Sequence, residues 1–360
     1  MKRIGIDARL LFQTGVGTYL QNLLHEISLS KSTDISFTIY CLPSDVDFIK
    51  KEIPDAHVHI TRSLWHTMSE QTRFLFEIQK DSLDLMHFTY FGHPILYRAP
   101  FIATIHDVTP LLFKTGLASK KNRITYSIKH CAFSAVLRNQ MVHSRAVITP
   151  TTIVKEQLIT LYGEAYSSKI YPIYEGVSYR LMGIEEKRPT IVRPYLLYVG
   201  NFYPHKNVIS LVRAFARSKS PYALVLAGPQ GYFLEALLKA CTDEEKKNLI
   251  IKDKPSLPEL AGLYKHAEAL IHPSYAEGFG LPLVEAMHFG IPIIASHIPV
   301  FQELLGTSYY SFDPYEVNSI QEAIQRFEQA KIKTVNMLKP DFSFVQMTKR
   351  TMDLYKQYAQ

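Results

Sequence analysis

The chain has 360 residues and a net charge of +7, and 47% of its residues are hydrophobic and 20% charged, which is typical of a globular protein of two domains. Cys41, Cys131 and Cys241 are isolated, so they indicate neither a disulfide framework nor a metal site. Met1-Lys2-Arg3 leads directly into IGID, and no apolar run reaches the roughly 18 residues of a membrane span, so we expect a cytoplasmic protein without a secretory signal.

Short apolar runs alternate with helical patterns along the chain. The predicted strands of a first series are Arg3–Asp7, Ile35–Cys41, His57–Thr61, Leu85–Phe88, Phe101–Ile105 and Ala146–Thr149. Those of a second series are Tyr195–Val199, Tyr222–Ala227, Leu249–Lys252, Ala269–His272 and Ile291–Ser296. Helices are predicted between most of them, as at Gly17–Leu29 and Val208–Ala216. This alternation predicts an α/β protein with two doubly wound parallel sheets, each covered by helices.

The domain boundary is predicted in the charged, proline-containing segment EEKRPTIVRP, residues 185–194. Residues 1–184 then form an N-terminal domain and residues 195–340 a C-terminal domain. A last helical segment, 341–360, follows, with Ser343 as the predicted N-cap of a helix that ends at Tyr358.

Residues 114–145 form a basic stretch with seven Lys or Arg and no Asp or Glu. Its apolar residues recur at spacings of three and four, which predicts an amphipathic helix. The helix could be a solvated one packed on a core, or a surface that meets anionic lipid or an anionic acceptor. No nucleic-acid-binding motif accompanies the charge, so a nucleic-acid partner is not expected.

Ligands of doubly wound sheets bind at the carboxyl ends of strands, so the residues after each strand are the candidates. Gly15 and Gly17 follow IGID and are predicted to precede a helix that begins near Thr18, where amide groups could bind an anion. Leu20 stands where a dinucleotide fingerprint needs a third glycine, which argues against NAD or FAD. His106 ends the run FIATIH and could face a ligand or belong to a turn.

Lys206 lies just before a predicted helix, in the segment that follows Gly200. A cation at a helix N-terminus opposes the helix dipole, which makes sense if an anion such as phosphate lies between them. A solvated loop lysine is the alternative.

The stretch EGFGLPLVEAMHFG contains two carboxylates, Glu277 and Glu285, eight residues apart. Pro282 is typical of a first helical turn, and Glu285 is predicted to lie in the same turn, where the dipole favours its ionised form. Glu277 precedes the helix, so the two are not expected to act as an equivalent acid–base pair.

Taken together, these segments resemble glycosyltransferase family 4. EGFGLPLVEAM matches the family's E-x7-E signature, VGNFYPHKN its phosphate-binding segment, and IGIDARLLFQTGVGTYLQNLL its N-terminal loop. The resemblance covers nearly the whole chain and is greatest to bacterial mannosyltransferase-like members. It implies the GT-B architecture, in which two Rossmann-like domains face a central cleft and a final helix, here within 341–360, returns to the first domain.

The resemblance also implies roles for single residues. Lys206 would neutralise the donor diphosphate, Glu277 would hold the donor sugar and Glu285 would bind the ribose hydroxyls. His106 would contact the sugar from the acceptor side. The remaining implied donor-binding residues are Gly15, Gly17, Gly200, Asn201, Phe279, Gly280 and Leu281. Many members have arginine at the position of Asn201, so a second phosphate cation is absent unless Arg9 supplies it.

The implied reaction is the transfer of a hexose, with mannose favoured, from a GDP- or UDP-linked donor to a hydroxyl of a glycan or lipid-linked acceptor in cell-surface polysaccharide or lipopolysaccharide synthesis. Anomeric configuration would be retained, and neither a metal nor a cofactor would be needed. The enzyme would be cytoplasmic, or peripheral on the inner face of the membrane. The alternatives are a nucleotide-sugar epimerase, a phosphorylase, and a non-catalytic protein that binds sugar nucleotides or glycans.

Overall fold

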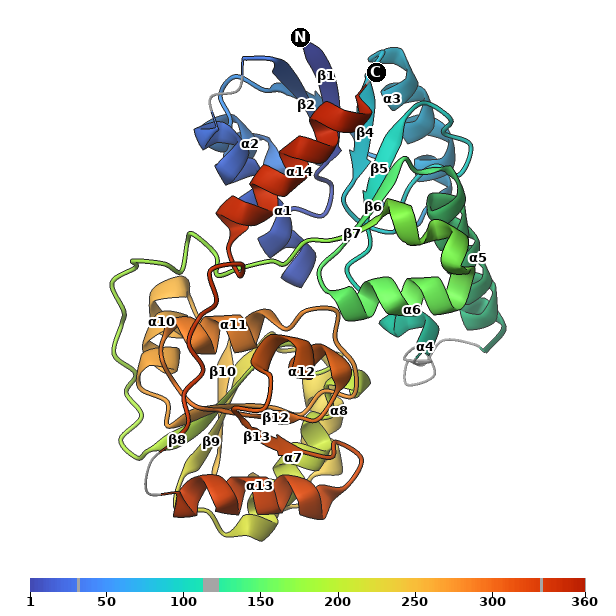
Figure 1. The fold of residues 1–360 in the computed structure, drawn as a ribbon. Coiled ribbons are helices and arrows are strands. Elements are labelled where there is room, and N and C mark those ends of the chain that lie inside the picture. Colours follow the sequence, from blue (N-terminus) through green and yellow to red (C-terminus); the bar gives the residue numbers. More distant parts are fainter. Residues whose placement is uncertain (31–32, 113–122, 331–332, 360) are drawn as a thin grey trace. The chain divides into compact units, whose positions relative to one another are not determined.

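The computed structural model describes residues 1–30, 33–112, 123–330 and 333–359. The chain divides into two compact units (Figure 1). Within the described residues, the first unit comprises Met1–Leu112, residues 123–175 and Ser343 onward, and the second comprises Gly176–Phe342. The second unit also includes the predicted linker 185–194, whose residue Lys187 is bonded to it. Its N–H donates to the Pro258 carbonyl at 2.9 Å, and its ammonium pairs with Glu259.

The first unit contains a seven-stranded parallel sheet in the order β3-β2-β1-β4-β5-β6-β7. Its strands are β1 (Lys2–Asp7), β2 (Ile35–Cys41), β3 (His57–Ile60), β4 (Leu85–Phe88), β5 (Phe101–Thr104), β6 (Ala146–Thr149) and β7 (Ile170–Pro172). Its helices are α1 (Thr14–Leu29), α2 (Val46–Glu52), α3 (Leu75–Lys80), α4 (Thr109–Leu112), α5 (Arg123–His143), α6 (Thr152–Tyr162) and α14 (Phe344–Tyr358). A π-helical turn, η2 (Glu70–Phe74), precedes α3.

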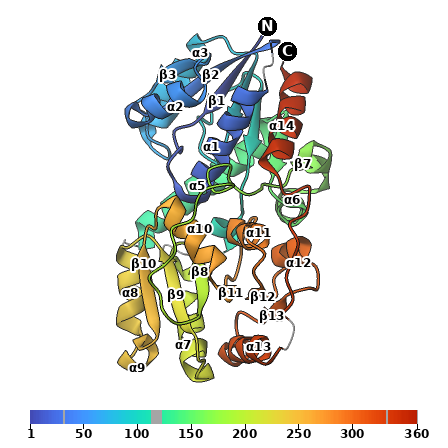
Figure 2. The ribbon, with the colours of Figure 1, turned by 90° about the vertical axis from the view of Figure 1, so that its left-hand side faces the viewer.

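The second unit contains a six-stranded parallel sheet in the order β10-β9-β8-β11-β12-β13, which can be followed in Figure 2. Its strands are β8 (Tyr195–Val199), β9 (Ala223–Gly228), β10 (Leu249–Asp253), β11 (Ala269–His272), β12 (Ile293–Ser296) and β13 (Tyr310–Phe312). Its helices are α7 (Val208–Ser218), α8 (Tyr232–Ala240), α9 (Asp243–Lys246), α10 (Leu257–Lys265), α11 (Leu281–His288), α12 (Pro299–Leu305) and α13 (Val317–Gln329). A 3-10 turn, η5 (Pro204–Lys206), precedes α7.

The sequence predicts the central strands because they are continuous apolar runs buried on both faces, as β4, β5, β6, β11 and β12 are. The edge strands β7 and β13 are not predicted. Each has only three residues, which is too short a segment to predict a strand from its apolar pattern.

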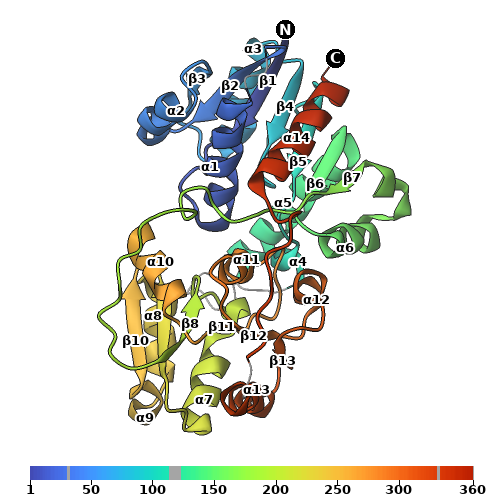
Figure 3. The ribbon, with the colours of Figure 1, turned by 60° about the vertical axis from the view of Figure 1, so that its left-hand side comes forward.

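The last helix, α14, packs beside α1 in the first unit although the two helices come from opposite ends of the chain (Figure 3). The Ser343 hydroxyl accepts from the Gln346 N–H, which confirms the predicted N-cap. The Tyr355 hydroxyl is 2.7 Å from Nδ1 of His87, a buried residue of β4. Lys2 of β1 donates to the carbonyls of Lys356 and Ala359. These contacts attach the end of the chain to the first sheet.

Candidate functional site

The second sheet has one point at which its strand order reverses, between β8 and β11. The two strands pair in parallel with Leu197 opposite Leu270, and from there the chain builds outward in both directions. Ligands of such sheets bind where the loops after these two strands diverge. Those loops are residues 200–207 and 273–280, which include Lys206 and Glu277.

Lys206 and Glu277 form a largely buried ion pair at this point. The Lys206 ammonium donates to both carboxylate oxygens of Glu277, at 2.6 and 2.8 Å. The lysine loop is fixed because Asn207, in a left-handed conformation, donates through its side chain to the Pro314 carbonyl at 2.7 Å. An ammonium has three protons, so the pair leaves one to donate to a ligand.

Two further groups donate to Glu277. His272, the last residue of β11, donates from Nε2 over 3.0 Å, and the Ser274 hydroxyl donates over 2.6 Å. Burial disfavours the Glu277 charge, but Lys206 and His272 outweigh it and hold the pKa of the carboxyl well below its usual range. Burial lowers the pKa of His272, so its imidazole is neutral at pH 7. Glu277 is therefore an ionised acceptor, unsuited to donating a proton.

Glu285 has a different environment. Helix α11 begins at Leu281, so Glu285 is its fifth residue, and its predicted place in the first turn was wrong. The Tyr264 hydroxyl donates to its Oε2 at 2.6 Å. Burial raises the pKa of Glu285. The helix dipole was predicted to lower it, but the free amide groups at the helix start lie a full turn away from the carboxylate. The two glutamates therefore differ in surroundings and in proton affinity, as expected of unequal roles.

The three residues just before α11, Gly278, Phe279 and Gly280, carry no polar side chain. Gly280 is the N-cap of the helix with φ of 108°, a conformation that favours glycine. Phe279 is buried and meets Phe342 edge-on at 6.0 Å. The N–H of Leu281 is the first of the helix and has no partner within it. An anion at the start of α11 would therefore meet the N–H of Leu281, one of the three residues whose amide groups the resemblance implies, with Phe279 and Gly280.

Gly200 and Asn201 shape the start of the lysine loop. A Cβ added to Gly228 would lie 1.9 Å from the Gly200 carbonyl oxygen, so the two segments pass each other closely. The Asn201 carbonyl accepts from the Tyr198 hydroxyl, and its Oδ1 accepts from the Tyr203 N–H at 3.3 Å. Asn201 therefore supports a turn and supplies no cation.

Gly15 and Gly17 lie inside helix α1, which begins at Thr14 and not near Thr18 as predicted. A Cβ on Gly17 would lie 2.6 Å from the Leu11 carbonyl oxygen, so close packing accounts for this glycine. Gly15 is exposed, with space for a Cβ. The structure thus gives Gly17 a packing role, and of the two glycines only Gly15 is exposed.

His106, just beyond β5, has both ring nitrogens engaged within the first unit. Nδ1 lies 3.2 Å from Glu175 Oε1, and Nε2 donates to the Thr89 carbonyl at 2.9 Å. The Tyr19 ring meets the imidazole edge-on at 4.9 Å. The sequence alone gives no role to Glu175, because its partner His106 lies 69 positions away in the chain.

Arg9 does not supply the second phosphate cation. Its guanidinium is buried and pairs with Asp7 at 2.7 Å and Glu70 at 2.8 Å. Two carboxylates therefore already neutralise its charge.

Comparisons with known proteins identify the family of the chain. The model for glycosyl transferases group 1 matches residues 185–340, and the model for Glycosyltransferase Family 4 matches residues 14–180. The chain is 26% identical over 337 residues, 90% of each chain, to the O-antigen chain mannosyltransferase RfbU of Salmonella typhimurium. The chain belongs to glycosyltransferase family 4. The predicted enzyme class is thereby confirmed.

Solved structures confirm the GT-B fold of this glycosyltransferase. Sucrose-phosphate synthase from Thermosynechococcus elongatus has a TM-score of 0.75 at 18% identity, and the alignment covers 99% of both chains. Anabaena HepE in complex with UDP and glucose has a TM-score of 0.74 at 14% identity, over 99% of this chain and 100% of that one.

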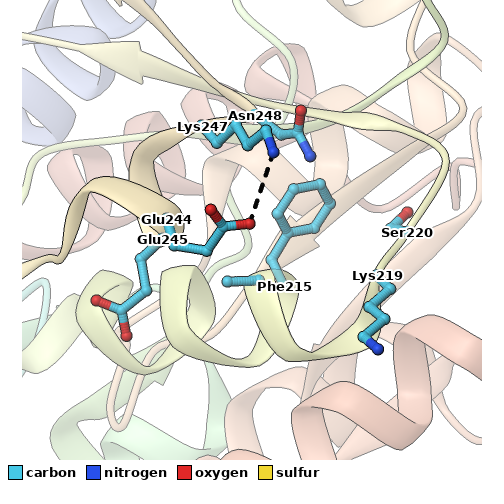
Figure 4. A pocket seen from close by; sticks show the side chains of 8 residues that line it. Phe215, Lys219, Ser220, Glu244, Glu245, Lys247 and Asn248 are labelled. Carbon is cyan, nitrogen blue, oxygen red and sulfur yellow. Dashed lines mark ion pairs between the residues drawn. The ribbon is translucent and has the colours of Figure 1, made fainter.

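A pocket of about 230 Å³ lies in the second unit of the glycosyltransferase, on the side of the sheet where the amino end of β10 lies (Figure 4). Its lining carries both charge signs, including an ion pair of 3.8 Å between Lys247 and Glu244. It is remote in the fold from the carboxyl ends of β8 and β11, so we assign no donor-binding role to it.

Helix α5 occupies residues 123–143 of the basic stretch, which confirms a helix there, whereas residues 114–122 lie outside the described part of the chain. None of the described helices is both long and apolar enough to cross a membrane. Within the described ranges, no three His, Cys, Asp or Glu side chains are grouped to hold a metal ion.

Proposed function

We propose that this glycosyltransferase transfers a hexose, with mannose favoured, from a nucleoside diphosphate sugar to a hydroxyl of a glycan or lipid-linked acceptor, with retention of configuration. The observation that carries the donor assignment is the cluster of Lys206, Glu277 and His272 where the second sheet reverses its strand order. Similarity to an O-antigen mannosyltransferase supports mannose and a role in lipopolysaccharide synthesis. HepE, crystallised with UDP and glucose, supports a nucleotide-sugar donor.

In this proposal the third proton of the Lys206 ammonium and the amide groups at the start of α11 stabilise the diphosphate as it leaves. Glu277 accepts hydrogen bonds from the donor sugar, and Glu285 accepts them from the ribose. The bond from the anomeric carbon to the phosphate oxygen breaks, and the acceptor oxygen bonds to that carbon from the same face. The acceptor proton passes to the departing diphosphate, so no residue of the protein has to act as a covalent nucleophile.

A binding screen over GDP, UDP, ADP and dTDP by calorimetry is the direct test of the donor assignment. One nucleotide should bind, and Glu285→Ala should raise its Kd about tenfold, the scale of losing a hydrogen bond to a charged group. With the matching donor sugar the same change should mainly raise KM. Tyr264→Phe is the matched control, because it removes the hydroxyl but keeps the carboxylate, and it should change the Kd much less. An unchanged Kd in Glu285→Ala would refute the ribose role, and no binding by any of the four nucleotides would refute the donor site.

The basic stretch 114–145 motivates a membrane-proximal acceptor, because clustered Lys and Arg bind anionic lipid. We expect the protein to co-sediment with vesicles that contain anionic phosphatidylglycerol and to remain in solution with vesicles of neutral phosphatidylcholine. Changing Lys120, Lys121 and Arg123 together to glutamine should abolish the difference. Equal sedimentation with both vesicle types would contradict a charge-driven membrane contact.

A further inference from the structure

The first unit contains a row of neighbouring rings that leads from an exposed loop to His106. The His66 ring stacks on Tyr90 at 5.9 Å with 27° between the planes, and on Phe91 at 5.8 Å with 12°. Tyr90 in turn lies 6.4 Å from the His106 ring. His66 follows β3, Tyr90 and Phe91 follow β4, and His106 follows β5, so the row crosses the carboxyl edge of the first sheet.

A buried ion cluster holds the outer end of this row. The Arg9 guanidinium donates to the Ser63 carbonyl at 3.1 Å and to Glu70 Oε1 at 2.8 Å. The other oxygen of Glu70 accepts from the His66 N–H at 3.1 Å. His66 has φ of 57°, which few residues other than glycine adopt. The hydrogen bonds of Arg9 and Glu70 to the loop, here called the clamp, keep it in this strained conformation. The loop is therefore built in advance, which reduces the entropy cost of binding a ligand.

The same loop exposes apolar side chains within two residues of His66 in the sequence. Leu64 is 49% exposed and Met68 is 77% exposed, while Trp65 between them is half-buried. An imidazole and aromatic faces at the carboxyl edge of a sheet, next to exposed apolar side chains, suit a ligand that is part sugar and part hydrocarbon. The C–H face of a sugar ring packs on an aromatic ring, and its hydroxyls hydrogen-bond to polar groups.

We infer that His66 and Tyr90 form the binding subsite for the acceptor saccharide, with Leu64 and Met68 contacting the apolar carrier attached to it. The inference rests on the proposed glycosyl transfer and specifies which part of the first unit selects the acceptor. Arg9 and Glu70 act as positioning residues, since they hold the loop without touching the ligand.

Trp65 is the only tryptophan of the chain, so its fluorescence reports on this loop alone. We expect octyl α-D-mannopyranoside, below its micelle concentration, to change the emission in a saturable way. Methyl α-D-mannopyranoside should bind more weakly, because it lacks the chain that Leu64 and Met68 contact. His66→Ala and Tyr90→Leu should each raise the Kd of the octyl glycoside about tenfold. Phe76→Ala, which removes an exposed ring on α3, is the matched control and should leave it unchanged.

Calorimetry with GDP and UDP on the same sample separates failure of this inference from failure of the proposed function. If a nucleotide binds but the octyl glycoside leaves the emission of Trp65 unchanged, the acceptor subsite is wrong and the donor site stands. An equal response to a sugar-free octyl detergent would also overturn the subsite, because only apolar contact would then be present. If neither class of ligand binds, the proposed function fails and the subsite fails with it.

Discussion

Lys206→Ala is expected to lower the rate of hexose transfer by at least about tenfold, the minimum for losing one preorganised charge at a reacting centre. The lysine is held in place by Glu277 at 2.6 and 2.8 Å, so its remaining proton has a fixed direction before the donor binds. A leaving diphosphate gains charge in the transition state, and a fixed cation stabilises that charge more than the charge of the ground state.

The same substitution should also weaken the fold of the second unit. Glu277 would remain as a largely buried carboxylate with only His272 and Ser274 as donors, and an uncompensated buried charge costs on the order of 3 kcal/mol. Activity and stability must therefore be measured together. In the double variant Lys206→Met/Glu277→Gln no buried charge is left unpaired, so stability should largely return while transfer stays low.

Donor turnover and thermal unfolding of these variants separate the two effects. Lys247→Ala is the matched control, because this lysine is exposed and belongs to the pocket on the side of the amino end of β10. Lys247→Ala should change neither the rate of donor turnover nor the unfolding temperature. Near-normal transfer by Lys206→Ala would rule out the phosphate role, and recovery of transfer in the double variant would show that stability alone was at fault. Glu277→Gln on its own should mainly lower kcat, in contrast to the KM effect expected for Glu285→Ala.

The pattern of apolar runs in the sequence was enough to predict both parallel sheets. Strands such as Leu85–Phe88 and Tyr195–Val199 have the predicted bounds because buried parallel strands are short, continuous apolar runs. Helix starts were harder. Gly15 and Gly17 suggested a loop, yet α1 begins at Thr14, since glycine is tolerated in a first turn that packs against Leu11.

The partners of the site residues could not be predicted. His272 and Ser274 lie within five residues of Glu277, so a polar cluster after β11 was visible in the sequence, although its hydrogen bonds were not. Glu175 and Glu70 find their partners 69 and 61 residues away, and a single sequence gives no measure of such distances. The raised pKa of Glu285 likewise depends on burial, which the local helix pattern does not reveal.

Arg9→Met should destabilise the first unit by about 3–5 kcal/mol, the usual cost of removing one partner from a buried ion cluster. The Arg9 and Glu70 side chains are each only 1% exposed, and the guanidinium also packs 3.8 Å from the centre of the Phe74 ring. Methionine keeps much of that apolar contact, so the loss should come mainly from two carboxylates left without a cation.

The pH dependence of this variant distinguishes an electrostatic cause from a packing defect. Burial already raises the pKa of Glu70 despite the neighbouring Arg9, and without the arginine that pKa should rise further. Between the ordinary carboxyl pKa and the raised one, the folded state then binds more protons than the unfolded state, so stability falls as pH rises. The destabilisation should therefore be larger at pH 7 than at pH 5, whereas a packing defect would be independent of pH.

Thermal unfolding of Arg9→Met at several pH values, with Arg62→Met as the exposed control, measures this dependence. Adding Glu70→Gln to Arg9→Met should restore part of the stability, because one uncompensated charge disappears. The clamp on the His66 N–H should remain weakened, so Trp65 emission should stay altered although the fold recovers. If Arg9→Met unfolds at the same temperature as Arg62→Met at every pH, the buried cluster contributes nothing to stability, and a loop held by it is no longer a reasonable basis for acceptor selection.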